Sequence, residues 1–177
     1  LGDVHPGGNP HVHLDPRNLA ILSKELSRRL IQLDPPNTVY YRNRLDAFQR
    51  DWRTAMDGWK SRVTKLSGLP VIVHHKSFTY LINWIGLKEV ATLEVKPGIP
   101  PTASHLNNLL LSARSQKVKV ILRTPYDPAE ASVWLASKSG IATLMLPYTV
   151  DKEAPPGALA RLFDLTVALL EKAHAEP

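Results

Sequence analysis

The sequence predicts an α/β protein, with a small, mostly parallel four-stranded sheet, flanking helices and a long helical segment before the sheet. Three observations predict this class. Short β-rich runs alternate with helical patterns after residue 70, which is typical of a parallel sheet. Two long stretches before residue 70 carry apolar residues at helical spacing. The 177 residues are 44% hydrophobic, which suffices for a core of ordinary size.

The first helix is predicted from about Pro16 to Leu33, where leucines recur at helical spacing. Asp15 comes directly before it, and Asp at this position can accept hydrogen bonds from free N–H groups of the first turn. Pro16 suits the first helical position because its missing N–H would have no partner there. Asp34-Pro35-Pro36 interrupts the pattern, so the helix is expected to end before it.

A second, longer helix is predicted over residues 37–66, about 45 Å long at about 1.5 Å per residue. Its apolar stripe includes Phe48, Trp52 and Trp59. We expect the small sheet to leave part of this aromatic face exposed. Large exposed apolar patches tend to find partners, which predicts self-association through this helix, most simply as a homodimer.

The remaining elements are predicted from residue 70 onward. Strands are expected at residues 71–74, 89–95, 117–122 and 143–146, and helices at 77–85, 102–115, 128–139 and 156–173. Gly86 and Gly140 suit the positions that follow helix C-termini. Asp127, with Pro128 and Glu130 after it, is typical of a capped helix start. The chain is therefore divided into residues 1–69, with a His-rich loop and long helices, and residues 70–177, a C-terminal α/β lobe.

Composition excludes several classes of site and partner. The absence of cysteine excludes disulfides and Cys-based zinc sites, which leaves His, Asp and Glu as metal ligands. The formal charge is +6, but the basic residues are scattered among acids on helical polar faces, so no nucleic-acid partner is expected. No apolar run approaches the roughly 20 residues of a membrane span, and no secretory signal peptide is recognisable.

The most distinctive stretch is residues 2–16, which hold three histidines and two aspartates among Gly and Pro. Imidazoles and carboxylates crowded into a turn-rich loop are typical of a transition-metal site. By itself the stretch leaves two readings open, a metal site and a group of incidental histidines. His5 is expected at the surface, with an auxiliary ligand as the alternative.

A second histidine signal lies in the stretch from Val71 to Tyr80. His75 falls at the carboxyl end of the first predicted strand, and ligands bind at that end of the strands in open α/β sheets. If the strand persists through His74 and His75, the two side chains must point in roughly opposite directions. His75 can then face a cleft, and its alternative role is that of a hydrogen-bonded structural histidine.

These two stretches carry a resemblance to a known family. Asn9-Pro10-His11-Val12-His13-Leu14-Asp15-Pro16 resembles the D-P-H-x-W-L-D-P signature of the zinc/manganese class of solute-binding proteins of ABC importers, and His75-Lys76-Ser77-Phe78-Thr79-Tyr80 resembles its H-D-A-F-x-Y segment. The resemblance implies one lobe of a two-lobed metal-binding protein, with a long helix tying the lobes together. The family's first histidine ligand comes from an N-terminal lobe, which we expect this chain to lack because it begins just upstream of the second ligand motif.

The resemblance implies His11 and His75 as metal ligands. His13 stands where the family usually has Trp, so its role as a ligand stays open. The family's acidic ligand follows the last strand, and Asp151 is displaced from that place by at least one position, so it is either a ligand or an exposed loop residue. Glu94 is interpreted as a solvated or capping residue.

The resemblance also predicts the cargo and the function. An imidazole at position 75, where manganese-selective members place a carboxylate, favours Zn2+, with Mn2+ as the alternative. We therefore expect a periplasmic or otherwise extracytoplasmic zinc-binding protein, not an enzyme, that delivers the ion to a membrane permease of an ABC importer. A zinc-dependent hydrolase with an open coordination position is the alternative, although the chain has no H-E-x-x-H and no G-x-S-x-G motif. An interaction module with incidental histidines is a third possibility.

Overall fold

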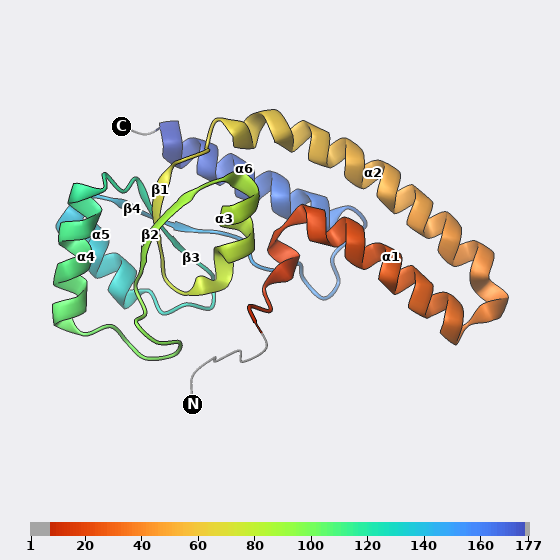
Figure 1. Ribbon diagram of the computed structural model, residues 1–177, viewed down its shortest axis with the longest axis horizontal. Helices are drawn as coiled ribbons and strands as arrows, with labels where there is room; N and C mark the ends of the chain where they lie inside the picture. Colours follow the sequence, from red (N-terminus) through yellow and green to blue (C-terminus); the bar gives the residue numbers. More distant parts are fainter. Residues whose placement is uncertain (1–7, 176–177) are drawn as a thin grey trace.

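The computed structural model describes residues 8–175, so His5 lies outside the described residues. A hairpin of two long helices, α1 (Pro16–Leu33) and α2 (Thr38–Thr64), extends to one side of an α/β lobe (Figure 1). A short 3-10 turn, Pro35–Asn37, joins the two helices. No helix within residues 8–175 is long and apolar enough to cross a membrane.

The start of α1 confirms the sequence prediction. The Asp15 carboxylate accepts a hydrogen bond from the backbone N–H of Arg17 at 2.8 Å, and Pro16 occupies the first helical position. The Arg17 side chain also pairs with Asp15 at 2.6 Å. This cap fixes the beginning of α1, and with it the turn that carries His11 and His13 just before the helix.

Both tryptophans of the aromatic face of α2 are buried, so the expectation that part of this face stays exposed is wrong for them, whereas Phe48 is half-buried. Trp52 and Trp59 are 3% and 1% exposed. The C-terminal helix α6 (Ala158–Ala175) lies beside α2 (Figure 1) and places the Phe163 ring 5.6 Å from Trp52 and 5.3 Å from Trp59, measured between ring centroids. Trp59 Nε1 donates a hydrogen bond to Asp164 at 2.6 Å. The premise for a homodimer through these tryptophans therefore does not hold.

The lobe contains the predicted parallel sheet. Its strands are β1 (Pro70–Val73), β2 (Lys88–Thr92), β3 (Val120–Arg123) and β4 (Ala142–Met145), in the spatial order β2-β1-β3-β4. All three pairings are parallel, with Val71 opposite Val120 between β1 and β3. This sheet confirms the predicted fold class.

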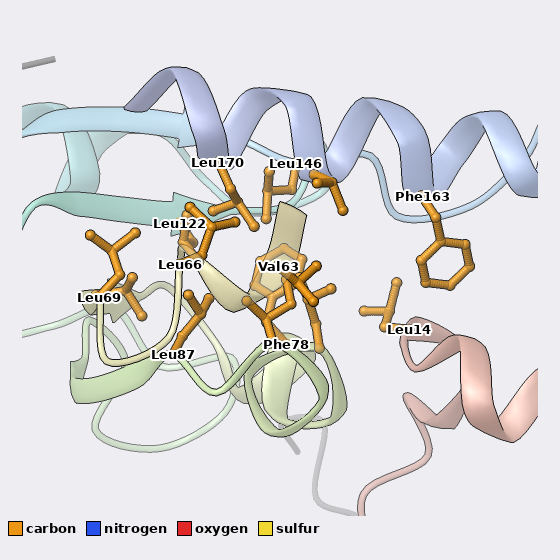
Figure 2. Packing of buried hydrophobic residues seen from close by; sticks show 14 of the residues in the cluster. Leu14, Val63, Leu66, Leu69, Phe78, Leu87, Leu122, Leu146, Phe163 and Leu170 are labelled. Atoms are coloured by element: carbon orange, nitrogen blue, oxygen red, sulfur yellow. The ribbon is translucent and has the colours of Figure 1, made fainter. Parts of the chain in front are cut away.

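Helices cover both faces of the sheet. Val73 and Leu122 belong to a core that includes residues of α2, α3 (Thr79–Ile85) and α6, and Figure 2 shows Phe163 and Leu170 of α6 directed into it. Ile72 and Ile121 belong to a second core with α4 (Ala103–Ser115) and α5 (Glu130–Ser139). Successive strand residues face opposite sides, which explains why neighbours enter different cores.

Local sequence signals predict the C-terminal ends of α3 and α5 correctly but not the start of α5. Gly86 and Gly140 follow α3 and α5 with φ of 80° and 74°, as predicted for left-handed C-terminal positions. The predicted cap of α5 is wrong. The helix begins at Glu130 without a side-chain cap. Asp127 instead accepts a hydrogen bond from the backbone N–H of Thr124 at 2.6 Å, which closes the loop after β3.

Candidate metal site

The loop before α1 and the carboxyl ends of the central strands enclose a pocket of about 260 Å³. This is the edge of a parallel sheet where ligands are expected. The residues that line the pocket include His11, His75, Glu94, Tyr126, Asp127 and Tyr148. The structure therefore brings His11 and His75 together, although 63 positions separate them in the sequence.

Hydrogen bonds tie the His11 loop to the segment that follows His75. The Asn9 side chain accepts a hydrogen bond from the backbone N–H of His11 at 2.9 Å and donates one to the carbonyl oxygen of Lys76 at 2.7 Å. The Tyr80 hydroxyl donates to the carbonyl oxygen of Asn9 at 3.1 Å. The two segments that resemble family motifs are thus fastened to each other, which sets the position of His11 relative to His75.

The geometry of the two imidazoles suits a shared ion. Their ring centroids lie 5.9 Å apart and the rings are nearly perpendicular, at 89°. With zinc–nitrogen bonds of about 2.0–2.1 Å, two imidazoles on one tetrahedral ion have centroids roughly 5 to 6 Å apart. His11 is 8% exposed. The pair could therefore bind one ion with little movement.

Glu94 contacts His75 directly, so its interpretation as a solvated or capping residue is wrong. One oxygen of its carboxylate accepts two hydrogen bonds, from His75 Nδ1 at 2.9 Å and from the backbone N–H of Gly98 at 3.3 Å. Both side chains are largely buried, with 14% and 13% exposure. Because a carboxylate only accepts hydrogen bonds, His75 Nδ1 carries the proton in this contact, and Nε2 is the nitrogen through which a neutral imidazole in this tautomer would bind a metal.

The relative direction of His74 and His75 depends on where the first strand ends. β1 ends at Val73, but strand-type hydrogen bonds continue at His74, which donates to the carbonyl oxygen of Leu122 at 2.8 Å and accepts from the N–H of Glu94 at 3.1 Å, and the backbone of His75 is also extended. Both imidazoles reach Glu94, with His74 Nε2 3.6 Å from its second carboxylate oxygen. His74 is buried and lines a separate cavity of about 560 Å³ beside Trp134. His74 and His75 thus lie at two cavities that share Glu94.

Tyr148 brings the end of β4 into the site. Its hydroxyl is hydrogen-bonded to Nδ1 of His11. Its carbonyl oxygen accepts a hydrogen bond from Nε2 of His13 at 3.1 Å, and the two rings meet edge to face with centroids 5.0 Å apart. His13 is not one of the residues that line the pocket. Its imidazole instead contacts the ring and the backbone of Tyr148.

The structure places Asp151 away from the two histidines. It is exposed in the loop after β4 and lines a different hollow of about 490 Å³, with Glu153 and Arg161. Asp127 is the aspartate at the pocket. Among residues 8–175, no group of three or more His, Cys, Asp or Glu side chains is close enough together to hold a metal ion. Of the four predicted ligands, His11 and His75 share the pocket.

Sequence comparisons find relatives over nearly the whole chain. A family model described as zinc-uptake complex component A, periplasmic, matches residues 2–173. The high-affinity zinc uptake system protein ZnuA of Bacillus subtilis is 27% identical over 138 residues, which cover 78% of this chain and 43% of the relative. The ZnuA protein of Brucella abortus is 24% identical over 119 residues, which cover 67% of this chain and 36% of the relative. The match thus spans about two fifths of these relatives' length.

Solved structures share the fold. A crystal structure of ZnuA superposes with a TM-score of 0.83 at 20% identity, covering 95% of this chain and 61% of that one. The solute-binding protein FpvC of Pseudomonas aeruginosa in complex with Ni2+ superposes with a TM-score of 0.77 at 24% identity, and the match covers 96% of this chain and 65% of that one. None of these comparisons supports a homodimer. The match to the family model covers most of the sequence, and the chain belongs to the family of zinc-uptake complex component A.

Proposed function

We propose that this chain is the metal-binding part of a periplasmic or otherwise extracytoplasmic solute-binding protein that captures zinc and delivers it to the permease of an ABC importer. The observation that carries the proposal is the pair of His11 and His75 at one pocket. Membership of a zinc-uptake family supports the same function. The ion is the cargo of this site.

The division of the chain follows from the proposed function. Residues 1–69 contribute the loop with His11 and the long helices, and residues 70–177 contribute the lobe with His75. The hydrogen bonds that Asn9 donates to Lys76 and Thr79, in the segment after His75, support a site assembled from both parts. His13 and Asp151 are weaker candidates, because His13 contacts Tyr148 and Asp151 lines another hollow.

Zinc is proposed over manganese on the chemistry of the donors. Two imidazoles are typical zinc ligands, whereas manganese prefers carboxylate, carbonyl and water oxygens. The fold alone does not select the ion, since FpvC has been solved in complex with Ni2+ and with Mn2+.

The pocket is proposed as a capture site without catalysis. The family belongs to uptake systems, and no observation in residues 8–175 favours the alternative of a zinc-dependent hydrolase.

Self-association stays a prediction, and light scattering with and without zinc would test it. The large apolar side chains that are exposed on the hairpin include Ile21, Leu26 and Leu33.

Calorimetric zinc titration of single variants tests the proposed function. His11→Ala and His75→Ala should each lower zinc affinity by more than about 100-fold, because removing a ligand costs more than removing the partner of a ligand. His174→Ala is the control, since that imidazole is exposed near the end of α6. Zinc affinity that is unchanged in both ligand variants would refute the proposed site.

A further inference from the structure

Tyr148 lines the pocket but is not one of the residues predicted to bind the metal. It follows β4 and is clamped among three rings, with centroid distances of 5.7 Å to His11, 5.0 Å to His13 and 5.8 Å to Tyr126. The hydrogen bond from His13 to the Tyr148 carbonyl holds its backbone as well. The phenol ring is therefore held in place before any ion binds.

The hydroxyl of this clamped ring bonds to one specific atom of His11, the ring nitrogen Nδ1. An imidazole has two nitrogens, and a partner on one of them decides which nitrogen presents its lone pair to a metal. A phenolic oxygen can accept a hydrogen bond from Nδ1–H. Tyr148 then leaves His11 Nε2 as the coordinating atom.

His75 is held in the same manner by a different residue. Glu94 bonds its Nδ1 at 2.9 Å, so both proposed ligands have an oxygen partner on Nδ1. The partners differ in chemistry, because Glu94 supplies a carboxylate and Tyr148 a phenol. The phenol adds no carboxylate donor to the pocket, and the carboxylate of Asp127 is already bonded to the backbone N–H of Thr124.

We propose that Tyr148 is a positioning residue that fixes His11 for coordination through Nε2 and biases the pocket toward zinc over manganese. This inference rests on the proposed function, because it concerns the same two histidines. A hydrogen-bond partner of a metal-binding histidine typically contributes about 10–100-fold to metal affinity. Manganese prefers carboxylate oxygens, which the phenol at this position does not supply.

Calorimetric titration with zinc and with manganese tests the inference on the full chain. Tyr148→Phe removes only the hydroxyl and should lower zinc affinity about 10–100-fold. Tyr148→Asp places a carboxylate near His11 and should shift the zinc-to-manganese affinity ratio toward manganese. Tyr40→Phe is the matched control, since it also removes one phenolic hydroxyl, but Tyr40 is 59% exposed on α2 and is not among the residues that line the pocket. Its zinc affinity should equal that of the unmodified chain.

A second readout separates positioning from a general loss of packing. Long-range nitrogen–proton NMR correlations of the metal-free chain should show His11 protonated at Nδ1, and Tyr148→Phe should remove this preference while the His75 signals stay unchanged. If Tyr148→Phe keeps the zinc affinity, the metal ratio and the His11 tautomer, the inference is wrong, while loss of zinc in His11→Ala would leave the proposed function intact. Full zinc binding by His11→Ala would overturn both.

Discussion

Glu94 accepts a hydrogen bond from His75 Nδ1 at 2.9 Å, and both side chains are largely buried. The contact joins the loop after β2 to the end of β1, the neighbouring strand. A carboxylate behind a histidine fixes the ring orientation and raises the basicity of the other nitrogen. Glu94 is therefore placed to position His75 in the proposed metal site.

Replacing Glu94 by Gln should lower zinc affinity about 10–100-fold, because Gln keeps the shape of the side chain but loses the charge that supports the imidazole. Calorimetric titration measures the change. Glu130→Gln is the matched control, since Glu130 is exposed and lines the neighbouring cavity with His74. If the two variants bind zinc equally well, Glu94 has no positioning role.

The chain should prefer zinc over manganese under matched conditions. The two imidazoles of His11 and His75 are nitrogen donors, which suit zinc better than manganese. Competition with a fluorescent chelator, run in parallel for both ions, measures the ratio of affinities. Manganese binding that equals or exceeds zinc binding would contradict the assignment of the cargo.

An ion pair between α2 and α6 predicts how stability changes with pH. Arg62 Nη2 lies 2.7 Å from a Glu171 carboxylate oxygen, and this hydrogen bond lowers the pKa of Glu171 below its usual value. A lowered pKa in the folded state stabilises the fold at pH values above the unfolded pKa of about 4.3. This contribution is lost as the pH falls through the lower pKa of the folded state.

Glu171→Gln should therefore reduce the free energy of unfolding near neutral pH, by no more than about 1 kcal/mol because the pair is partly exposed to solvent. Urea unfolding at about pH 7 and about pH 3 measures the difference from the unmodified chain, which should shrink at the lower pH. Glu153→Gln, in an exposed loop, serves as the control. A difference that stays the same at both pH values would show that the loss is not electrostatic.

Much of the fold could be predicted because its signals are local. Asp15 and Pro16 mark the start of α1, and Gly86 and Gly140 mark two helix ends. The covering of Trp52 could not be predicted in this way. It depends on α6, which follows more than 100 residues later in the sequence. An apolar stripe indicates that a face is buried somewhere, but it does not identify the element that covers it.

The site was predictable to a similar extent. His11 and His75 lie in recognisable motifs and share the pocket. Glu94 and Tyr148 were missed because their roles come from strand order: the ends of β2 and β4 reach the site only once the sheet has formed as β2-β1-β3-β4. One signal could have identified Glu94, since it lies near the carboxyl end of the strand predicted at residues 89–95, which was expected to run parallel to the strand predicted at 71–74, directly before His75.

Zinc-edge anomalous diffraction from crystals of the chain grown with zinc tests the central claim most directly. The account predicts one anomalous peak in the pocket between His11 and His75, with a ring nitrogen of each at about 2.0–2.1 Å. A peak that contacts only one of the two histidines, or that lies in another part of the chain while this pocket holds none, would contradict the account.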